Sequence, residues 1–244
     1  MQNSDFNVSE YSVFVSNKLI LSNLNISLCI GECCVVLGKN GAGKTSLFDS
    51  LFDIIPNIGL INLLQYNNST EKNWLQMKNI MGYSGRSVQF MEYLDVETNI
   101  RFISQLYNIS FKVSEKKMND FFEYFSINMK IKKQKFGELS SGEMKLVGLC
   151  ASVIHDPFLI IWDEPYSGLD VIMHNKLTAK IIELKKKNKI LLISSHEMHS
   201  IKEISSKILI IDQGKQLFFD TLEKFCLDDN SVNSLLRYIS PSNA

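Results

Sequence analysis

The sequence contains no long apolar run. Apolar stretches such as residues 158–162 and 190–193 are far shorter than the roughly 18 to 20 residues that a membrane-spanning helix needs. The first fifteen residues lack the basic start and apolar stretch of a signal peptide, and they also lack the arginine-rich amphipathic pattern of a transit peptide. We therefore expect a chain that does not cross a bilayer and that stays in the compartment where it is made.

The sequence also has no net charge. Its 26 basic residues balance its 26 acidic residues, so its charge provides no reason to expect nucleic acid or an anionic membrane surface as a partner. Proline is scarce, at four residues, and no long polar tract occurs, which argues against disorder. With 244 residues and no linker or internal repeat, we treat residues 1–244 as one structural unit.

Cysteine and histidine are few, and neither the cysteines nor three of the four histidines have a spacing typical of a site. An odd number of cysteines without C-x-x-C spacing fits neither a disulfide framework nor a zinc site. We expect them to be small buried hydrophobic residues: Cys29, Cys33, Cys34, Cys150 and Cys226. Three of the four histidines are expected on the surface of helices: His155, His174 and His199.

Short apolar runs alternate with segments of helical spacing. The runs at 33–37, 80–83, 158–162 and 190–193 suit a parallel sheet that is covered on both faces. Helical spacing follows the first run and returns between residues 97 and 133. The stretch 13–30 and the pair 208–211 and 216–219 resemble edge or antiparallel strands. This pattern predicts an α/β fold with a helical subdomain at about 95–155 and a C-terminal tail at about 220–244.

Residues 38–45 match the phosphate-binding pattern G-x-x-x-x-G-K-[ST], between an apolar strand and a helix, as the motif requires. Glycines let backbone N–H groups converge on phosphate oxygens, and the helix N-terminus adds positive potential. Lys44 would neutralise the β- and γ-phosphates, and Thr45 would bind Mg²⁺. The alternative is a glycine-rich turn without a ligand. The predicted ATP-binding residues are Gly38, Lys39, Asn40, Gly41, Ala42, Gly43, Lys44, Thr45 and Ser46.

The apolar run at 158–162 ends in two carboxylates, Asp163 and Glu164. Carboxylates at the end of a buried strand are costly unless they meet a cation. Asp163 is the natural Mg²⁺ ligand, and Glu164 would polarise the water that attacks the γ-phosphate. The alternative is a solvated turn that ends the strand.

The segment L-S-S-G-E at 139–143 precedes a helix with an apolar face. Ser140 and Glu143 have the spacing of a capping box. An ordinary helix start explains this pattern by itself, whereas the functional alternative is a second anion clamp at a helix N-terminus.

Five segments occur in a specific order: G-K-N-G-A-G-K-T at 38–45, L-S-S-G-E at 139–143, I-I-W-D-E-P at 160–165, S-G-L-D at 167–170 and S-S-H-E at 194–197. With this order the chain resembles the ATP-binding cassette (ABC) ATPases over about residues 11–220. The resemblance implies a P-loop α/β fold with an antiparallel β edge, and hydrolysis of ATP to ADP and phosphate. It also implies that Ser140, Ser141 and Gly142 contact the γ-phosphate of ATP bound to a partner subunit, and that Asp170 is the D-loop aspartate.

Two further roles follow from the same resemblance. His196 would be the switch histidine, which holds the γ-phosphate and the attacking water. Adenine in this family stacks on an aromatic residue upstream of the P-loop, and Phe14 matches best, followed by Tyr11. The alternative for both aromatic residues is packing in a small core.

The sequence departs from the family at two places. After the apolar run at 80–83 the family usually has a glutamine that contacts Mg²⁺ and the membrane partner, whereas Arg86 and Ser87 stand there and Gln89 comes late. Leu146 stands where many members have a basic residue. The first departure makes an ATP-binding module with little or no hydrolysis an alternative to an ATPase.

The resemblance implies particular partners and a location. We expect ATP hydrolysis, with Mg²⁺, to drive transport through a separate integral membrane permease, together with a second ABC ATPase subunit, identical or different. The chain would lie at the cytoplasmic face of a membrane, or on the interior side of an organelle. The short spacing between Tyr83 and Leu139 is similar to that of exporter-type cassettes, and finer features resemble the haem-export ATPase of cytochrome c maturation. A nucleic-acid-linked cassette is the other alternative, but the chain has one P-loop and no sustained heptads.

Overall fold

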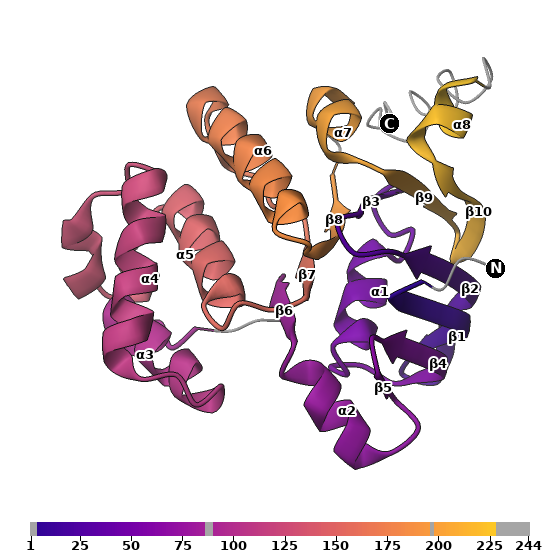
Figure 1. Cartoon of the computed structure of the whole chain (residues 1–244), viewed down its shortest axis with the longest axis horizontal. Helices are drawn as coiled ribbons and strands as arrows, with labels where there is room; N and C mark the ends of the chain where they lie inside the picture. Colours follow the sequence, from indigo (N-terminus) through magenta and orange to yellow (C-terminus); the bar gives the residue numbers. More distant parts are fainter. Residues whose placement is uncertain (1–3, 86–89, 196–197, 228–244) are drawn as a thin grey trace.

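The computed structural model describes residues 4–85, 90–195 and 198–227, and all structural statements here concern those residues. Its strands are β1 (Phe6–Val15), β2 (Lys18–Leu28), β3 (Cys33–Leu37), β4 (Asn57–Leu63), β5 (Tyr66–Asn67), β6 (Met81–Ser84), β7 (Leu159–Trp162), β8 (Ile190–Ser194), β9 (Lys207–Asp212) and β10 (Lys215–Thr221). The α-helices are α1 (Lys44–Leu51), α2 (Glu71–Lys78), α3 (Val96–Leu106), α4 (Phe111–Tyr124), α5 (Ser141–Val153), α6 (Val171–Lys186), α7 (Met198–Ile204) and α8 (Leu222–Leu227). Two 3₁₀ helices, η1 (Met129–Lys133) and η2 (Phe136–Glu138), lie between α4 and α5. Figure 1 shows these elements along the chain.

The strands form one sheet in the order β5-β4-β1-β2-β10-β9-β3-β8-β7-β6. The strands β9, β3, β8, β7 and β6 pair in parallel, and every residue of β3, β6, β7 and β8 is buried. Alternate side chains of these strands enter two different cores: Val35 and Trp162 pack with α5 and α6, whereas Val36 and Ile161 pack with α1. The predicted α/β fold, with a parallel sheet covered on both faces, is confirmed.

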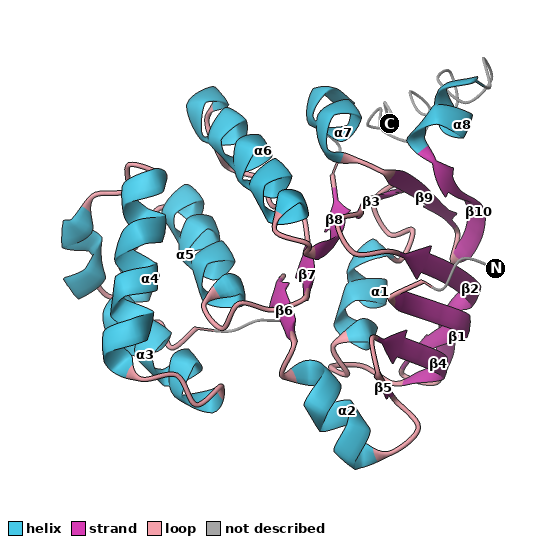
Figure 2. Ribbon diagram, in the orientation of Figure 1, coloured by secondary structure: helices cyan, strands magenta, loops and turns pink. Residues whose placement is uncertain are grey.

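The antiparallel part of the sheet lies at the right of Figure 2. It consists of β1, β2, β4 and β5, and β10 joins it to the parallel part by a parallel contact with β2. The stretch 13–30, expected to be an edge or antiparallel strand region, holds the end of β1 and all of β2, which pair antiparallel. The chain reverses between them at Ser16 and Asn17, both with positive φ. The segments 208–211 and 216–219 were expected to be edge or antiparallel strands, and they do pair antiparallel, as parts of β9 and β10. They do not lie at an edge, since β9 is between β3 and β10, and β10 is between β9 and β2.

Helices α3, α4 and α5 gather beyond β6, at the left of Figure 1. The apolar positions that predicted helices in this region are buried together: Ile100, Met118, Phe121, Phe122 and Phe125. The Asp95 side chain caps α3 by accepting a hydrogen bond from the Thr98 N–H at 2.7 Å. The bounds of the helical subdomain, about 95–155, stay a prediction.

Helix α5 lies against the edge strand β6 at very close range. A Cβ atom on Gly82 would lie 2.0 Å from the Ser152 carbonyl oxygen, and one on Gly148 would lie 3.1 Å from the Ser84 hydroxyl. The Trp162 indole of β7 also donates to the Ser152 hydroxyl, at 2.8 Å. Any side chain at Gly82 would therefore push α5 off the sheet, so glycine fixes the place of the helix that begins with the L-S-S-G-E segment.

Burial of the cysteines is confirmed for three of the five residues and is contradicted at Cys29. Cys33, Cys34 and Cys150 are buried, and burial raises the pKa of the Cys33 thiol to about 12. Cys29 is half-buried, and the side chain of Cys226 lies outside the described part of the chain. The described residues contain no group of three His, Cys, Asp or Glu side chains placed to hold a metal ion.

The expectation for His155 was wrong. This residue lies in the turn after α5, its ring stacks on Tyr107 with centroids 3.7 Å apart, and its Nε2 atom lies 2.9 Å from the Met81 carbonyl oxygen. Burial lowers the pKa of His155 to about 4. His174 does lie on helix α6, but its Nε2 atom lies 3.0 Å from the Tyr166 carbonyl oxygen, and the side chain of His199 is not among those described. In the described ranges no helix is both long and apolar enough to span a membrane.

Candidate functional site

The glycine-rich loop runs from the end of β3 to the start of α1. Gly38 lies so close to β9 that a Cβ atom there would be 2.4 Å from the Ile211 carbonyl oxygen. Gly41 and Gly43 have φ values of 81° and 109°, which other residues rarely adopt. Gly43 is the N-cap of α1, and no side chain caps this helix, so a bound anion would accept hydrogen bonds from its first-turn amides.

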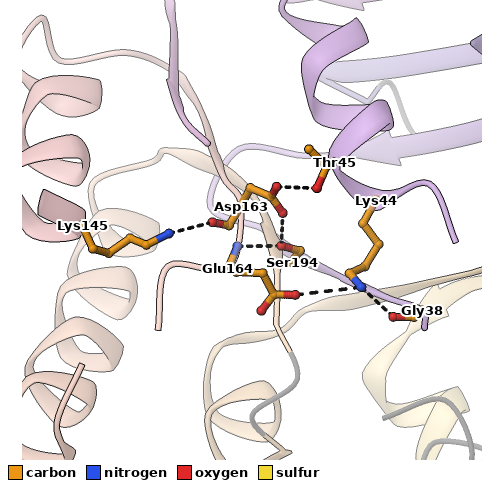
Figure 3. Close-up of polar contacts among 7 residues, drawn as sticks. All are labelled: Gly38, Lys44, Thr45, Lys145, Asp163, Glu164 and Ser194. Carbon is orange, nitrogen blue, oxygen red and sulfur yellow. Dashed lines mark hydrogen bonds and ion pairs between the residues drawn. The ribbon is translucent and has the colours of Figure 1, made fainter. Parts of the chain in front are cut away.

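Lys44 is buried beneath this loop, with 7% of its surface exposed. Its Nζ atom donates to the Gly38 carbonyl oxygen at 2.6 Å and lies 3.9 Å from Oε1 of Glu164 (Figure 3). Burial lowers the pKa of Lys44, and the carboxylates of Glu164 and Asp163 oppose that shift. The ammonium group is thus held at the position where the motif would present it to phosphate oxygens.

Asp163 follows β7 and is held by hydroxyl groups from two other elements. Its Oδ2 atom accepts a hydrogen bond from Thr45 Oγ1 at 2.7 Å, and its Oδ1 atom accepts one from Ser194 Oγ at 2.6 Å (Figure 3). The two predicted Mg²⁺ ligands, Thr45 and Asp163, are therefore in direct contact. Hydroxyl and carboxylate oxygens are the ligand types that Mg²⁺ prefers, so this pair fits the ion.

Glu164 adopts a left-handed backbone conformation, with a φ of 47°. Its N–H donates to Ser194 Oγ at 2.7 Å, and the preceding carbonyl, that of Asp163, accepts a hydrogen bond from Lys145 Nζ at 3.2 Å. Ser194 and Lys145 were both missed by the sequence reasoning. The signal for Ser194 was its place at the end of the apolar run at 190–193, because ends of neighbouring parallel strands meet at one sheet edge.

Lys44, Thr45, Asp163 and Glu164 line a cavity of about 520 Å³. The predicted residues Gly38 and Ala42 belong to the loop but are not part of the cavity lining, whereas Ile20 of β2, which was not predicted, is part of it. The volume lies in the usual range for small-molecule sites, about 300 to 1,000 Å³. The lining residues are Ile20, Lys39, Asn40, Gly41, Gly43, Lys44, Thr45, Ser46, Asp163 and Glu164.

The aromatic candidates for adenine do not lie in this lining. Tyr11 is completely buried in the core, so its ring offers no face to a ligand and the second choice was wrong. Phe14 is half-buried on β1, opposite Leu19 of β2. The structure does not bring Phe14 to the cavity, because β2 rather than β1 lies on the side of the sheet nearer to β3.

The L-S-S-G-E segment lies at a second cavity, of about 380 Å³. The capping box of Ser140 and Glu143 is present, as predicted. A Cβ atom on Gly142 would lie 2.9 Å from the Gly168 carbonyl oxygen. The Asp170 side chain caps α6 by accepting a hydrogen bond from the Met173 N–H at 2.8 Å. Ser140, Ser141, Gly142 and Asp170 therefore lie together, in a cavity whose described lining shares no residue with the first.

Several predicted residues lie outside the described part of the chain: His196, Arg86, Ser87 and Gln89. Leu146, the second departure from the family pattern, is buried and lines the second cavity. The basic side chain in this region is Lys145, one residue earlier, and it extends to the end of β7 instead.

Comparisons with known proteins all match ABC transporter proteins. A family model described as ABC transporter matches residues 21–167. The ABC transporter ATP-binding protein NatA of Bacillus subtilis is 26% identical over 226 residues, which cover 91% of this chain and 90% of NatA. The structure of an ATP-binding subunit of an ABC transporter superposes with a TM-score of 0.83 at 21% identity, covering 97% of this chain and 99% of that one. A dimeric bacterial ABC transporter cassette gives a TM-score of 0.78 at 15% identity, covering 89% and 98%. At these identities the two solved structures are similar in fold.

Proposed function

The chain belongs to the ABC transporter family, and on that premise we propose that it uses the cavity at its P-loop to bind and hydrolyse ATP and so drives transport through a separate membrane-spanning partner. Its family membership makes it an ATPase. The observation that supports the assignment of the site is the meeting of Lys44, Asp163 and Glu164 in one cavity of about 520 Å³. The chain brings a cation from the start of α1 and two adjacent carboxylates from the end of β7 to this place.

The phosphates of ATP would lie on the glycine-rich loop and the first turn of α1. A γ-phosphate in the cavity competes with Glu164 for Lys44, since the two side chains are 3.9 Å apart. Thr45 and Asp163 would hold Mg²⁺, which supplies positive charge that stabilises the phosphates as they react. All of the loop residues 38–46 would contribute to binding ATP.

Glu164 is the proposed general base. Its carboxylate accepts a proton from the attacking water while the water oxygen bonds to the γ-phosphorus and the bond from that phosphorus to the ADP oxygen breaks. The ion pair with Lys44 and the hydrogen bond from its own N–H to Ser194 hold Glu164 at the cavity wall. His196, which lies outside the described residues, remains the residue proposed to hold the γ-phosphate and the attacking water.

The second cavity supports a composite site. Ser140, Ser141 and Gly142 lie apart from the chain's own P-loop cavity, so we propose that they contact ATP bound to a second cassette, identical or different. Asp170, which caps α6 beside them, would lie at the same interface. The dimeric cassette among the structural neighbours supports this arrangement.

The other proposed partner is a membrane protein. The chain would bind an integral membrane permease from the cytoplasmic side, or from the interior side of an organelle. Haem, or another compound exported for cytochrome c maturation, is the transported substrate that the sequence resemblance favours, and it stays a prediction. Co-purification with the membrane subunit identifies that partner directly.

The proposed activity is tested by phosphate release from the parent chain and from Glu164→Gln. We expect the Gln variant to bind ATP and to lose most of its turnover, because an amide keeps the shape of the side chain but does not accept the proton. Glu123→Gln, an exposed position on α4, is the matched control and should turn over ATP like the parent. Undiminished hydrolysis by Glu164→Gln would place the base elsewhere.

A further inference from the structure

The peptide group that joins Asp163 to Glu164 is held from both sides. Its carbonyl oxygen accepts a hydrogen bond from Lys145 Nζ of α5, at 3.2 Å. Its N–H donates to Ser194 Oγ of β8, at 2.7 Å. Figure 3 shows the two side chains reaching this peptide from opposite directions. Two elements that are far apart in the sequence therefore determine its orientation.

The orientation of this peptide decides where the Glu164 carboxylate lies. Glu164 has a φ of 47°, a conformation that residues other than glycine, asparagine and aspartate seldom adopt. Such a conformation persists where the surroundings hold it in place. A rotated peptide would carry the Glu164 side chain away from Lys44, which now lies 3.9 Å from it.

Lys145 is well placed to provide this support. It is half-buried, and its hydrogen bond joins a charged donor to a carbonyl at the end of a fully buried strand. Such charge-assisted bonds are stronger than those between neutral groups. The helix that carries Lys145 is itself fixed against the sheet edge, because Gly82 allows the backbone of β6 to lie in contact with that of α5.

We propose that Lys145 is a positioning residue, which holds the Asp163–Glu164 peptide so that Glu164 faces the P-loop cavity and thereby joins the L-S-S-G-E helix to the chain's own catalytic carboxylate. Lys145 lies one helical turn, about 6 Å, from Ser141. Contact of Ser140–Gly142 with the partner's nucleotide would therefore be transmitted to Glu164 of the same chain. This inference rests on the proposed function, in which Glu164 is the base.

The first test compares Lys145→Met with Lys145→Arg. Methionine keeps the apolar stem and removes the ammonium group, whereas arginine keeps a charged donor. We expect Lys145→Met to lower kcat about tenfold or more with the Kd for ATP unchanged within about twofold, because a misplaced base affects the chemical step. Lys145→Arg should recover most of the turnover. Lys112→Met, at an exposed position on α4, is the control with parental kcat.

The second test asks whether Lys145 acts through Glu164. In the Glu164→Gln background, Lys145→Met should lower the residual turnover by less than about twofold, because residues that act as a unit are not additive. A full, additive loss in that background would indicate a disturbed helix instead and would overturn the proposal, as would parental kcat for Lys145→Met or failure of arginine to rescue. If Glu164→Gln itself hydrolyses ATP at the parental rate, it is the proposed function that fails.

Discussion

Replacing Ser194 with alanine removes one hydroxyl group that holds both carboxylate residues of the site. Ser194 is completely buried at the end of β8. Its Oγ atom donates to Asp163 Oδ1 at 2.6 Å and accepts from the Glu164 N–H at 2.7 Å. In Ser194→Ala the Asp163 carboxylate and the Glu164 N–H both lose this partner. The volume freed by the missing hydroxyl is small, so it leaves little room for another group to take its place.

The expected loss follows from the two hydrogen bonds. A bond to a charged group contributes about 1.5 to 3 kcal/mol, and one between neutral groups contributes about 0.5 to 1.5 kcal/mol. Ser194→Ala should therefore lower the free energy of unfolding by about 2 to 4 kcal/mol. It should also lower kcat, because both Asp163 and Glu164 lose a contact that orients them.

Denaturant unfolding at neutral pH measures this change, with Ser114→Ala as the control. Ser114 is equally buried, but its hydroxyl donates to the Phe111 carbonyl oxygen of its own helix, at 3.0 Å. Its removal should cost less than about 1 kcal/mol. If Ser194→Ala is as stable and as active as Ser114→Ala, the hydroxyl does not organise the site and the reasoning is refuted.

Three further predictions concern the nucleotide, the dimer and pH. Lys44→Ala should abolish binding of a fluorescent ATP analogue, since the phosphates lose the ammonium group of the loop; parental affinity would contradict the P-loop assignment. Glu164→Gln should elute as a dimer with ATP and Mg²⁺; a species that stays monomeric at high concentration, with or without the membrane partner, would exclude the composite site. The pKa of His155, lowered to about 4 by burial, means that the unfolded chain binds a proton at higher pH than the folded chain, so stability falls as pH drops from about 6.5 towards 4. The loss at pH 5 should be about 2 kcal/mol, and His155→Gln should remove it in denaturant unfolding; an unchanged pH slope would show that His155 does not cause it.

Much of the fold and part of the site are encoded in short, contiguous segments. The apolar runs that became β3, β6, β7 and β8 could be recognised because a strand buried on both faces is apolar throughout. The P-loop could be recognised because its glycines, lysine and threonine follow one another along the chain. The capping box of Ser140 and Glu143 was predictable for the same reason, since its partners are three residues apart.

Other expectations failed because they depended on which strands become neighbours. Tyr11 was a reasonable aromatic candidate by its distance along the chain, but the hairpin of β1 and β2 directs it into the core. Ile20 lines the cavity instead, because β2 is the strand on the side of β3. His155 stacks on Tyr107, 48 positions away along the sequence, because the C-terminal ends of α5 and α3 lie next to each other in space.

The residues proposed to carry the chemistry can be identified from the sequence alone, whereas the contacts that hold them arise only in the tertiary structure. Asp163 and Glu164 are identifiable as the carboxylates at the end of an apolar strand, because that information is local. Their contacts with Ser194 and Lys145 depend on β8 pairing next to β7 and on α5 packing against the sheet edge. Strand order and helix packing follow from the burial of the whole core, so no short segment of the chain encodes them.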